Sequence, residues 1–256
     1  MRVDLIDYTG CGSTNKWYAA DLLIWTKRTR VEMTPGGLME IKQWSEVKKL
    51  EELAYIAATI PSSWEMVDFT FLIQGVTRAI THQIVRTRTG SYAQQNMSVQ
   101  KMRGWEYHVG PSIEASLAAK TAYVGTMAQI AKAYEVLCNL PGVLVEDARG
   151  VLPTNITTNI VCKYNLRTLC DMLRKRLSPR NQGAKPGVKA GEWTELHGKM
   201  KERMIEVMPW TDLFLNRSAD KVAAEAYDLA NKVRDGGLRV DIMKRVDQLL
   251  VEQEDK

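Results

Sequence analysis

The segment DFTFLIQGVTRAITHQIV, residues 68–85, combines two hydrophobic periods and decides how the chain folds. Its first half alternates apolar with other residues, which predicts a half-buried β-strand. The apolar positions of this strand are Phe69, Phe71 and Ile73. Gly75 predicts the end of the strand. Apolar residues then recur every four positions, at Val76, Ile80 and Ile84, so a helix is expected from about residue 76 to residue 85.

The sequence on either side of this segment predicts further strands and more helices. Alternating β-branched residues predict a strand over residues 154–164, and Asn165 is expected to cap a helix that ends near Leu177. A short strand is expected near residues 5–8. Helices are expected over residues 39–54, 114–137, 146–151, 192–208, 218–234 and 240–254, and a mobile loop over residues 182–191. The fold class is therefore α+β, with more helices than strands, and the length of the chain fits one large domain or two small ones.

The net charge of +5 is modest, but the cations are unevenly distributed. Residues 69–105 contain five Lys or Arg and no Asp or Glu, and residues 172–191 contain six Lys or Arg and no Asp or Glu. Two such segments predict a cleft or surface that binds an anionic partner such as a phosphate. Two solvated basic faces are the alternative interpretation.

The segment RTRTGSYAQQNMS, residues 86–98, has the composition of a nucleotide-binding loop. Arginine binds phosphate through two parallel hydrogen bonds, and Gln and Asn amides match the mixed donor and acceptor edge of a nucleobase. Gly and Ser permit a close approach of the backbone. The segment therefore predicts a pocket for a nucleotide or another phosphate ester, with a polar surface loop as the alternative.

Four blocks of this sequence, in order over residues 62–182, resemble the flavin-dependent thymidylate synthase family. The family carries an Arg-His-Arg triplet, then after seven residues a Ser, and two residues later an Arg. The corresponding residues here are Arg86, Thr87, Arg88, Asn96 and Ser98. The flanking matches are Trp64-Glu65-Met66, Phe69-Thr70-Phe71, Thr81-His82-Gln83, Ala148-Arg149, Leu152-Pro153, Asn165-Leu166-Arg167-Thr168-Leu169, Arg176 and Gln182. The resemblance covers about half of the chain.

The resemblance implies the fold of that family: one domain over residues 1–256, with a central mixed or antiparallel sheet and a helix-rich C-terminal part. It implies an enzyme that transfers a one-carbon group from methylene-tetrahydrofolate to carbon 5 of a pyrimidine deoxynucleotide monophosphate, by default dUMP to dTMP. It also implies a homotetramer that binds FAD and uses NADPH to reduce it. By resemblance, the residues expected to contact FAD are Ser62, Arg86, Thr87, Arg88, Asn165, Arg167 and Asp171. Those expected to contact the nucleotide are Gln83, Gln94, Asn96, Ser98, Arg149 and Arg176. The catalytic candidates are Arg176, Gln94 and Asn96, with Arg176 expected to stabilise negative charge on the pyrimidine ring.

The chain departs from the family pattern inside the expected pocket. Asn96 replaces the family Ser, Ser98 replaces an Arg, and Thr87, Met66 and Asp171 each replace a His. Because Ser98 stands where the family has an Arg, one contact to phosphate is lost, and Lys101 or Arg103 can replace it. Asp171 lies one turn after Arg167, where it can pair with that arginine. These changes support the hypothesis that the substrate is dCMP, or that the product carries a hydroxymethyl group.

Several other protein classes are disfavoured. The sequence has no apolar run long enough to span a bilayer and no N-terminal signal-peptide pattern, so a soluble intracellular protein is expected. The four cysteines are expected to be reduced thiols, and neither they nor the three histidines have metal-site spacing. Classical thymidylate synthases use a reactive cysteine that follows a proline, and no cysteine follows a proline here. The sequence also has no dinucleotide-binding glycine motif. Two alternatives stay open: a non-catalytic nucleic-acid-binding protein, and an inactive relative that binds a nucleotide as a regulator.

Overall fold

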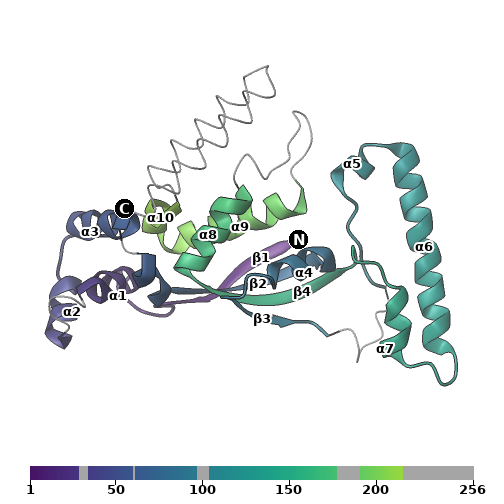
Figure 1. Ribbon diagram of the computed structural model, residues 1–256, viewed down its shortest axis with the longest axis horizontal. Helices are drawn as coiled ribbons and strands as arrows, with labels where there is room; N and C mark the ends of the chain where they lie inside the picture. Colours follow the sequence, from purple (N-terminus) through teal and green to yellow (C-terminus); the bar gives the residue numbers. More distant parts are fainter. Residues whose placement is uncertain (29–33, 60, 97–103, 178–190, 216–256) are drawn as a thin grey trace, which may run out of the picture.

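A four-stranded antiparallel sheet forms the centre of the protein (Figure 1). The computed structural model describes residues 1–28, 34–59, 61–96, 104–177 and 191–215. The strands lie in the order β1 (Arg2–Tyr8), β2 (Asp68–Thr77), β4 (Thr157–Asn165) and β3 (Ser91–Gln94). The α+β prediction is confirmed, and of the two expected sheet types the antiparallel one is present.

The alternation that predicted β2 and β4 places one row of side chains from each strand in the core. Phe69 pairs with Tyr164, and Phe71 pairs with Cys162. All four of these side chains are at most 1% exposed. Helices α8 (Leu166–Leu177) and α9 (Glu192–Val207) cover this face, as Figure 1 shows. Burial of this row of apolar surface is what holds the helices on the sheet.

Gly75 does not end the strand, contrary to the sequence prediction. Strand β2 continues to Thr77, and its pairing with β4 shifts register between Ile73 and Val76. Gly75 has a φ of +68°, a conformation that costs glycine little, so the extra residue is accommodated as a bulge. Val76 consequently belongs to the strand, and α4 (Arg78–Ile84) begins two residues later than expected.

The helix expected over residues 39–54 is two helices, α2 (Pro35–Lys42) and α3 (Glu46–Thr59). The Ser45 hydroxyl accepts a hydrogen bond from the Lys48 N–H at 3.3 Å, which satisfies an unpaired donor in the first turn of α3. The Trp44 indole donates to Glu40 at 3.2 Å and so folds back on α2. A local cap therefore interrupts an apolar pattern that is continuous in the sequence.

Helix α1 (Tyr18–Lys27), which the sequence reading did not predict, packs with α2, α3 and the 3-10 helix η2 (Pro61–Met66). Its buried Asp21 carboxylate lies 2.6 Å from the Lys49 ammonium of α3. Both side chains are at most 4% exposed. The pair ties α1 to α3 inside the protein.

Helix α6 (Leu117–Asn139) stands at the opposite end of the molecule from α1–α3, with α5 (Pro111–Glu114), α7 (Val145–Ala148) and the 3-10 helix η3 (Arg149–Val151) beside it (Figure 1). The predicted helices over residues 114–137, 146–151 and 192–208 are thus confirmed within a few residues. None of the described helices, α6 included, is long and apolar enough to cross a membrane. The helices expected over residues 218–234 and 240–254 lie outside the described residues, as does all but the last residue of the loop expected over residues 182–191.

Candidate functional site

A cleft with a volume of about 720 Å³ opens beside α8, and we call it the α8 cleft. Helix α8, the 3-10 helix η2 and the turn before β3 form its walls. Its lining residues are Glu65, Thr87, Thr89, Asn165, Arg167, Thr168, Asp171, Met172, Lys175 and Arg176. Five predicted site residues are among them: Thr87, Asn165, Arg167, Asp171 and Arg176. They come from segments about 80 residues apart in the chain, and the antiparallel pairing of β3 with β4 brings these segments together.

The turn over residues 86–90 presents Thr87 and Thr89 to the cleft. The Gly90 N–H donates to the Thr87 carbonyl at 3.0 Å, and the Tyr92 hydroxyl donates to the same carbonyl at 2.5 Å. The next residues, Ser91–Gln94, form the edge strand β3 and pair with β4. The segment expected to be an irregular loop is therefore a turn followed by a short strand.

Gly90 lies against two tyrosine side chains. A Cβ atom at this position would lie 2.4 Å from the Tyr92 hydroxyl oxygen and 2.7 Å from Cε1 of Tyr164. The Tyr92 and Tyr164 rings pack edge to face, and Tyr164 is only 1% exposed, so Tyr164 has little room to move. Because glycine has no Cβ, the turn that carries Thr87 can pack this closely against the two tyrosines.

We expect Gly90→Ala to lower the free energy of unfolding by about 1–3 kcal/mol, because the added methyl overpacks the tyrosine pair. Urea unfolding measures this loss. Gly125→Ala is the matched control, because a Cβ there meets nothing within 4 Å and the helix favours alanine. Equal stability of the Gly90→Ala and Gly125→Ala proteins would contradict the prediction.

Cys162 pairs with Tyr92 in the sheet and is not a nucleophile. Burial raises the pKa of its thiol to about 12, so the thiol stays protonated at neutral pH. Burial also raises the pKa of the neighbouring Tyr164 hydroxyl. Both groups are therefore neutral core side chains, and Tyr164 packs against Gly90 of the turn.

Asn165 caps α8 as predicted and also lines the cleft. Its side-chain oxygen accepts a hydrogen bond from the Thr168 N–H at 2.8 Å. The hydroxyls of Thr168 and Thr89 are 2.9 Å apart and hydrogen-bonded, which joins the first turn of α8 to the turn before β3. The N-terminus of α8, which favours anions, thus faces the cleft.

The acids of the cleft pair differently from the sequence prediction. Arg167 donates to Glu65 at 2.8 Å, and Asp171 pairs with Arg174 instead of with Arg167. Helix η2 brings Glu65 across from α8, and this position is set by tertiary structure. The Arg167–Glu65 pair is nearly half exposed on both sides, so an anion can displace Glu65 at small cost.

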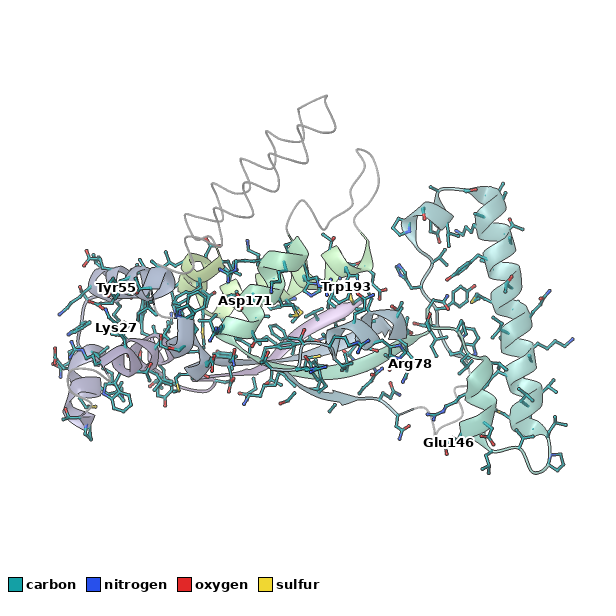
Figure 2. All side chains as sticks on the ribbon, in the orientation of Figure 1. Lys27, Tyr55, Arg78, Glu146, Asp171 and Trp193 are labelled. Carbon is teal, nitrogen blue, oxygen red and sulfur yellow. The ribbon has the colours of Figure 1, made fainter. Side chains whose placement is uncertain are left out.

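Arg176, near the end of α8, stacks on an aromatic side chain of α9. Its guanidinium carbon lies 4.5 Å from the centre of the Trp193 ring. Trp193 in turn stacks on His197, with ring centres 4.8 Å apart and planes 20° apart. Figure 2 shows Trp193 and Asp171 above the same side of the sheet.

His197 is fully buried, and burial lowers its pKa to about 4, so the ring is neutral at neutral pH. Its Nδ1 lies 2.7 Å from the Trp193 carbonyl oxygen. A carbonyl only accepts, so Nδ1 carries the proton and Nε2 is the bare nitrogen. A neutral ring here avoids repulsion of the Arg176 cation.

The depressed pKa of His197 makes stability depend on pH. Below pH 6.5 the unfolded chain binds a proton at His197 that the folded protein excludes, so stability falls as the pH falls from about 6.5 to 4. The loss reaches about 3 kcal/mol at pH 4. We expect His197→Leu to remove this part of the pH dependence in urea unfolding at pH 7, 5.5 and 4.5. If the free energy of unfolding of wild type and of His197→Leu depended on pH in the same way, the His197 imidazole would have the same pKa in the folded and unfolded states, contrary to the prediction.

The other predicted site residues are not among those that line the α8 cleft. Ser62, Gln83, Arg86, Arg88 and Asn96 are exposed. The Gln94 amide donates to the Thr81 hydroxyl at 3.0 Å. Ser98, Lys101 and Arg103 lie outside the described residues.

Arg149 is the clearest case of separation from the cleft. It donates to the carbonyl and the carboxylate of Glu146, which Figure 2 shows on α7 at the end of the molecule that carries α6. Burial and the nearby Arg149 cation together lower the pKa of Arg78. Arg149 therefore lies beside Glu146 and Arg78, whereas Arg176 lines the α8 cleft.

Sequence reasoning missed five lining residues of the cleft: Glu65, Thr89, Thr168, Met172 and Lys175. Lys175 lies within the acid-free segment 172–191, which was the available signal for it. Among the described residues, no group of three or more His, Cys, Asp or Glu side chains is arranged to hold a metal ion.

The family model for the thymidylate synthase complementing protein (Thy1) matches residues 4–210 of this chain. Three curated relatives are each named flavin-dependent thymidylate synthase. The one from Pyrococcus furiosus is 36% identical over 210 residues, 80% of each chain. Those from Nitratidesulfovibrio vulgaris and Clostridium tetani are 34% identical over 148 residues and 32% identical over 133 residues. These matches cover 54% and 46% of this chain and 60% and 53% of the relatives, so the chain spans a little over half the length of these two relatives.

Proposed function

Because the chain belongs to the thymidylate synthase complementing protein family, we propose that it is an FAD-dependent enzyme that transfers a one-carbon group to carbon 5 of a pyrimidine deoxynucleotide monophosphate, with dUMP to dTMP as the default reaction. The proposed co-substrates are methylene-tetrahydrofolate and NADPH. The observation that carries the proposal is the α8 cleft, in which Asn165, Arg167 and Arg176 meet Thr87.

The residues of the cleft fit a phosphate-bearing cofactor. Arg167 and Lys175 supply positive charge, Thr87 and Thr89 supply hydroxyls, and the start of α8 favours anions. A bound flavin supplies the hydride chemistry that no protein side chain provides. We assign Arg167, Asn165 and Thr87 to hold this group, and we retain Ser62, Arg86, Arg88 and Asp171 as proposed contacts.

Arg176 is the proposed catalytic cation. A guanidinium held in the cleft stabilises negative charge that develops on a pyrimidine ring during attack through carbon 5. The remaining proposed nucleotide contacts are Gln83, Gln94, Asn96, Ser98 and Arg149. They bind and orient the substrate, so its carbon 5 meets the one-carbon donor in a productive geometry.

The deciding experiment is an anaerobic single turnover of purified protein with FAD, NADPH and methylene-tetrahydrofolate, with dUMP and dCMP offered separately and products identified by mass. We expect dTMP from dUMP. A product from dCMP, or a hydroxymethyl product, would instead mean that the substitutions at Thr87, Asn96 and Ser98 changed specificity. Reducible bound flavin with no product from either nucleotide would refute the one-carbon activity. Colourless protein with salt-sensitive DNA affinity would favour a nucleic-acid-binding function.

We further propose that the enzyme is a homotetramer with sites shared between subunits. Helix α6 exposes apolar side chains, with Leu117 83% and Val136 52% exposed. Arg149, a proposed nucleotide contact, pairs with Glu146 and does not line the α8 cleft with Arg176, and a second copy of the chain would supply its own Arg149 to the nucleotide bound at Arg176. The free cysteines fit the expected intracellular location.

We expect light scattering to give a mass of four chains. We also expect a mixture of two inactive variants, Arg149→Ala and Arg176→Gln, to regain activity after subunit exchange, because some shared sites then contain both native arginines. A monomer in solution, or no recovery in a mixture shown to exchange subunits, would contradict shared sites.

A further inference from the structure

Trp193 contacts Arg176 but is not among the described residues that line the α8 cleft. Arg176 itself lines the cleft. The guanidinium carbon lies over the indole, 4.5 Å from the ring centre. A contact of this kind can use the face of a guanidinium, which leaves the five N–H donors in its plane for a ligand.

Two sets of contacts hold Trp193 in place. Its ring stacks on the buried His197, and the His197 Nδ1–H donates to the Trp193 carbonyl at 2.7 Å. The preceding residue, Glu192, accepts hydrogen bonds from the Thr77 N–H at 2.7 Å and from the Thr77 hydroxyl at 2.8 Å. Thr77 is itself the N-cap of α4, so the start of α9 is fastened to the junction of β2 and α4.

We propose that Trp193 is a positioning residue that sets the orientation of Arg176 toward the pyrimidine ring, and that the Glu192–Thr77 contact fixes Trp193 for this task. The inference rests on the proposed function, in which Arg176 contacts the nucleotide. A free arginine side chain has many rotamers, and binding must pay for the loss of this freedom. The indole restricts Arg176 before the nucleotide arrives, so the same contact costs less.

The test compares Trp193→Leu with Trp44→Leu. Trp44 carries a similar stack, with the Arg28 guanidinium 4.9 Å from its ring, but it lies away from the α8 cleft. We expect Trp193→Leu to weaken dUMP binding, measured by calorimetry, and to lower kcat, each about tenfold, with FAD binding unchanged. Trp44→Leu is expected to match wild type in all three. Trp193→Phe keeps an aromatic face and should stay within about threefold of wild type.

A double-mutant cycle separates positioning from general damage. If Trp193 acts through Arg176, Trp193→Leu adds little to the loss in dUMP affinity that Arg176→Gln already causes. Additive losses would overturn the proposal, as would wild-type dUMP affinity in Trp193→Leu. If Trp193→Leu does not fold, Glu192→Ala takes its place in the cycle with the same two readings. Wild-type protein that binds neither dUMP nor dCMP would refute the proposed function itself, and the inference with it.

Discussion

Replacement of Arg176 by glutamine is expected to lower kcat for one-carbon transfer about 100- to 1000-fold, with FAD still bound. Arg176 is a cation in the α8 cleft, and it stacks on Trp193 at 4.5 Å, so its charge is held before substrate binds. A glutamine amide keeps a hydrogen-bond donor but has no charge to offset negative charge on the ring. The loss therefore falls on the transition state more than on the bound substrate.

Single-turnover rates with saturating dUMP measure this effect, and flavin absorbance shows whether the cofactor stays bound. Arg203→Gln is the matched control. Arg203 lies on α9, half exposed, and pairs with Glu206, which raises its pKa, but it does not line the cleft. Its replacement should leave kcat within about twofold. A near-normal rate in Arg176→Gln would refute the catalytic assignment of Arg176.

The second large effect is expected on stability, from Lys49→Met. The Lys49 ammonium lies 2.6 Å from Asp21, and it also donates to the Lys42 carbonyl at 3.3 Å. The other Asp21 oxygen accepts from the Asn15 amide at 2.8 Å. Removing Lys49 leaves a buried carboxylate with only a neutral partner, so we expect the free energy of unfolding to fall by about 3–5 kcal/mol.

Urea unfolding at one protein concentration measures this loss, because a change in association would otherwise alter the apparent stability. Lys120→Met is the matched control: the Lys120–Glu114 pair is 46% exposed on both sides, so its loss should cost less than about 1 kcal/mol. The double variant Lys49→Met with Asp21→Leu should recover much of the lost stability. Similar losses in the two single variants would show that burial of the pair does not matter.

Features that depend on near neighbours in the chain were predictable from the sequence. The alternation of Phe69, Phe71 and Ile73 predicted the buried face of β2, and Asn165 predicted the start of α8. Both follow from the geometry of a strand or of a helix end, which a few residues decide. Prediction from near neighbours was wrong at two positions. Strand β2 continues through a bulge at Gly75, where the strand was expected to end, and a cap at Ser45 divides the expected helix in two.

The candidate site was predictable in part. Resemblance selected five of the residues that line the α8 cleft, and the acid-free segment 172–191 contained the lysine that it missed. Neither the resemblance nor the acid-free segment indicates which charged residues pair with each other. Arg167 pairs with Glu65, 102 residues earlier, and not with the nearby Asp171, because η2 folds back beside α8.

The sequence by itself thus determined the strand and helix types, the family motifs and the cationic character of the site, because these depend on residue type and short spacing. Tertiary structure alone decided which charges meet. Pairing of β3 with β4 brought Thr89 to Thr168, and packing of α9 on α8 brought Trp193 into contact with Arg176. An ion pair or a stack requires contact within a few ångströms, and for residues far apart in the chain only the packed fold sets that distance.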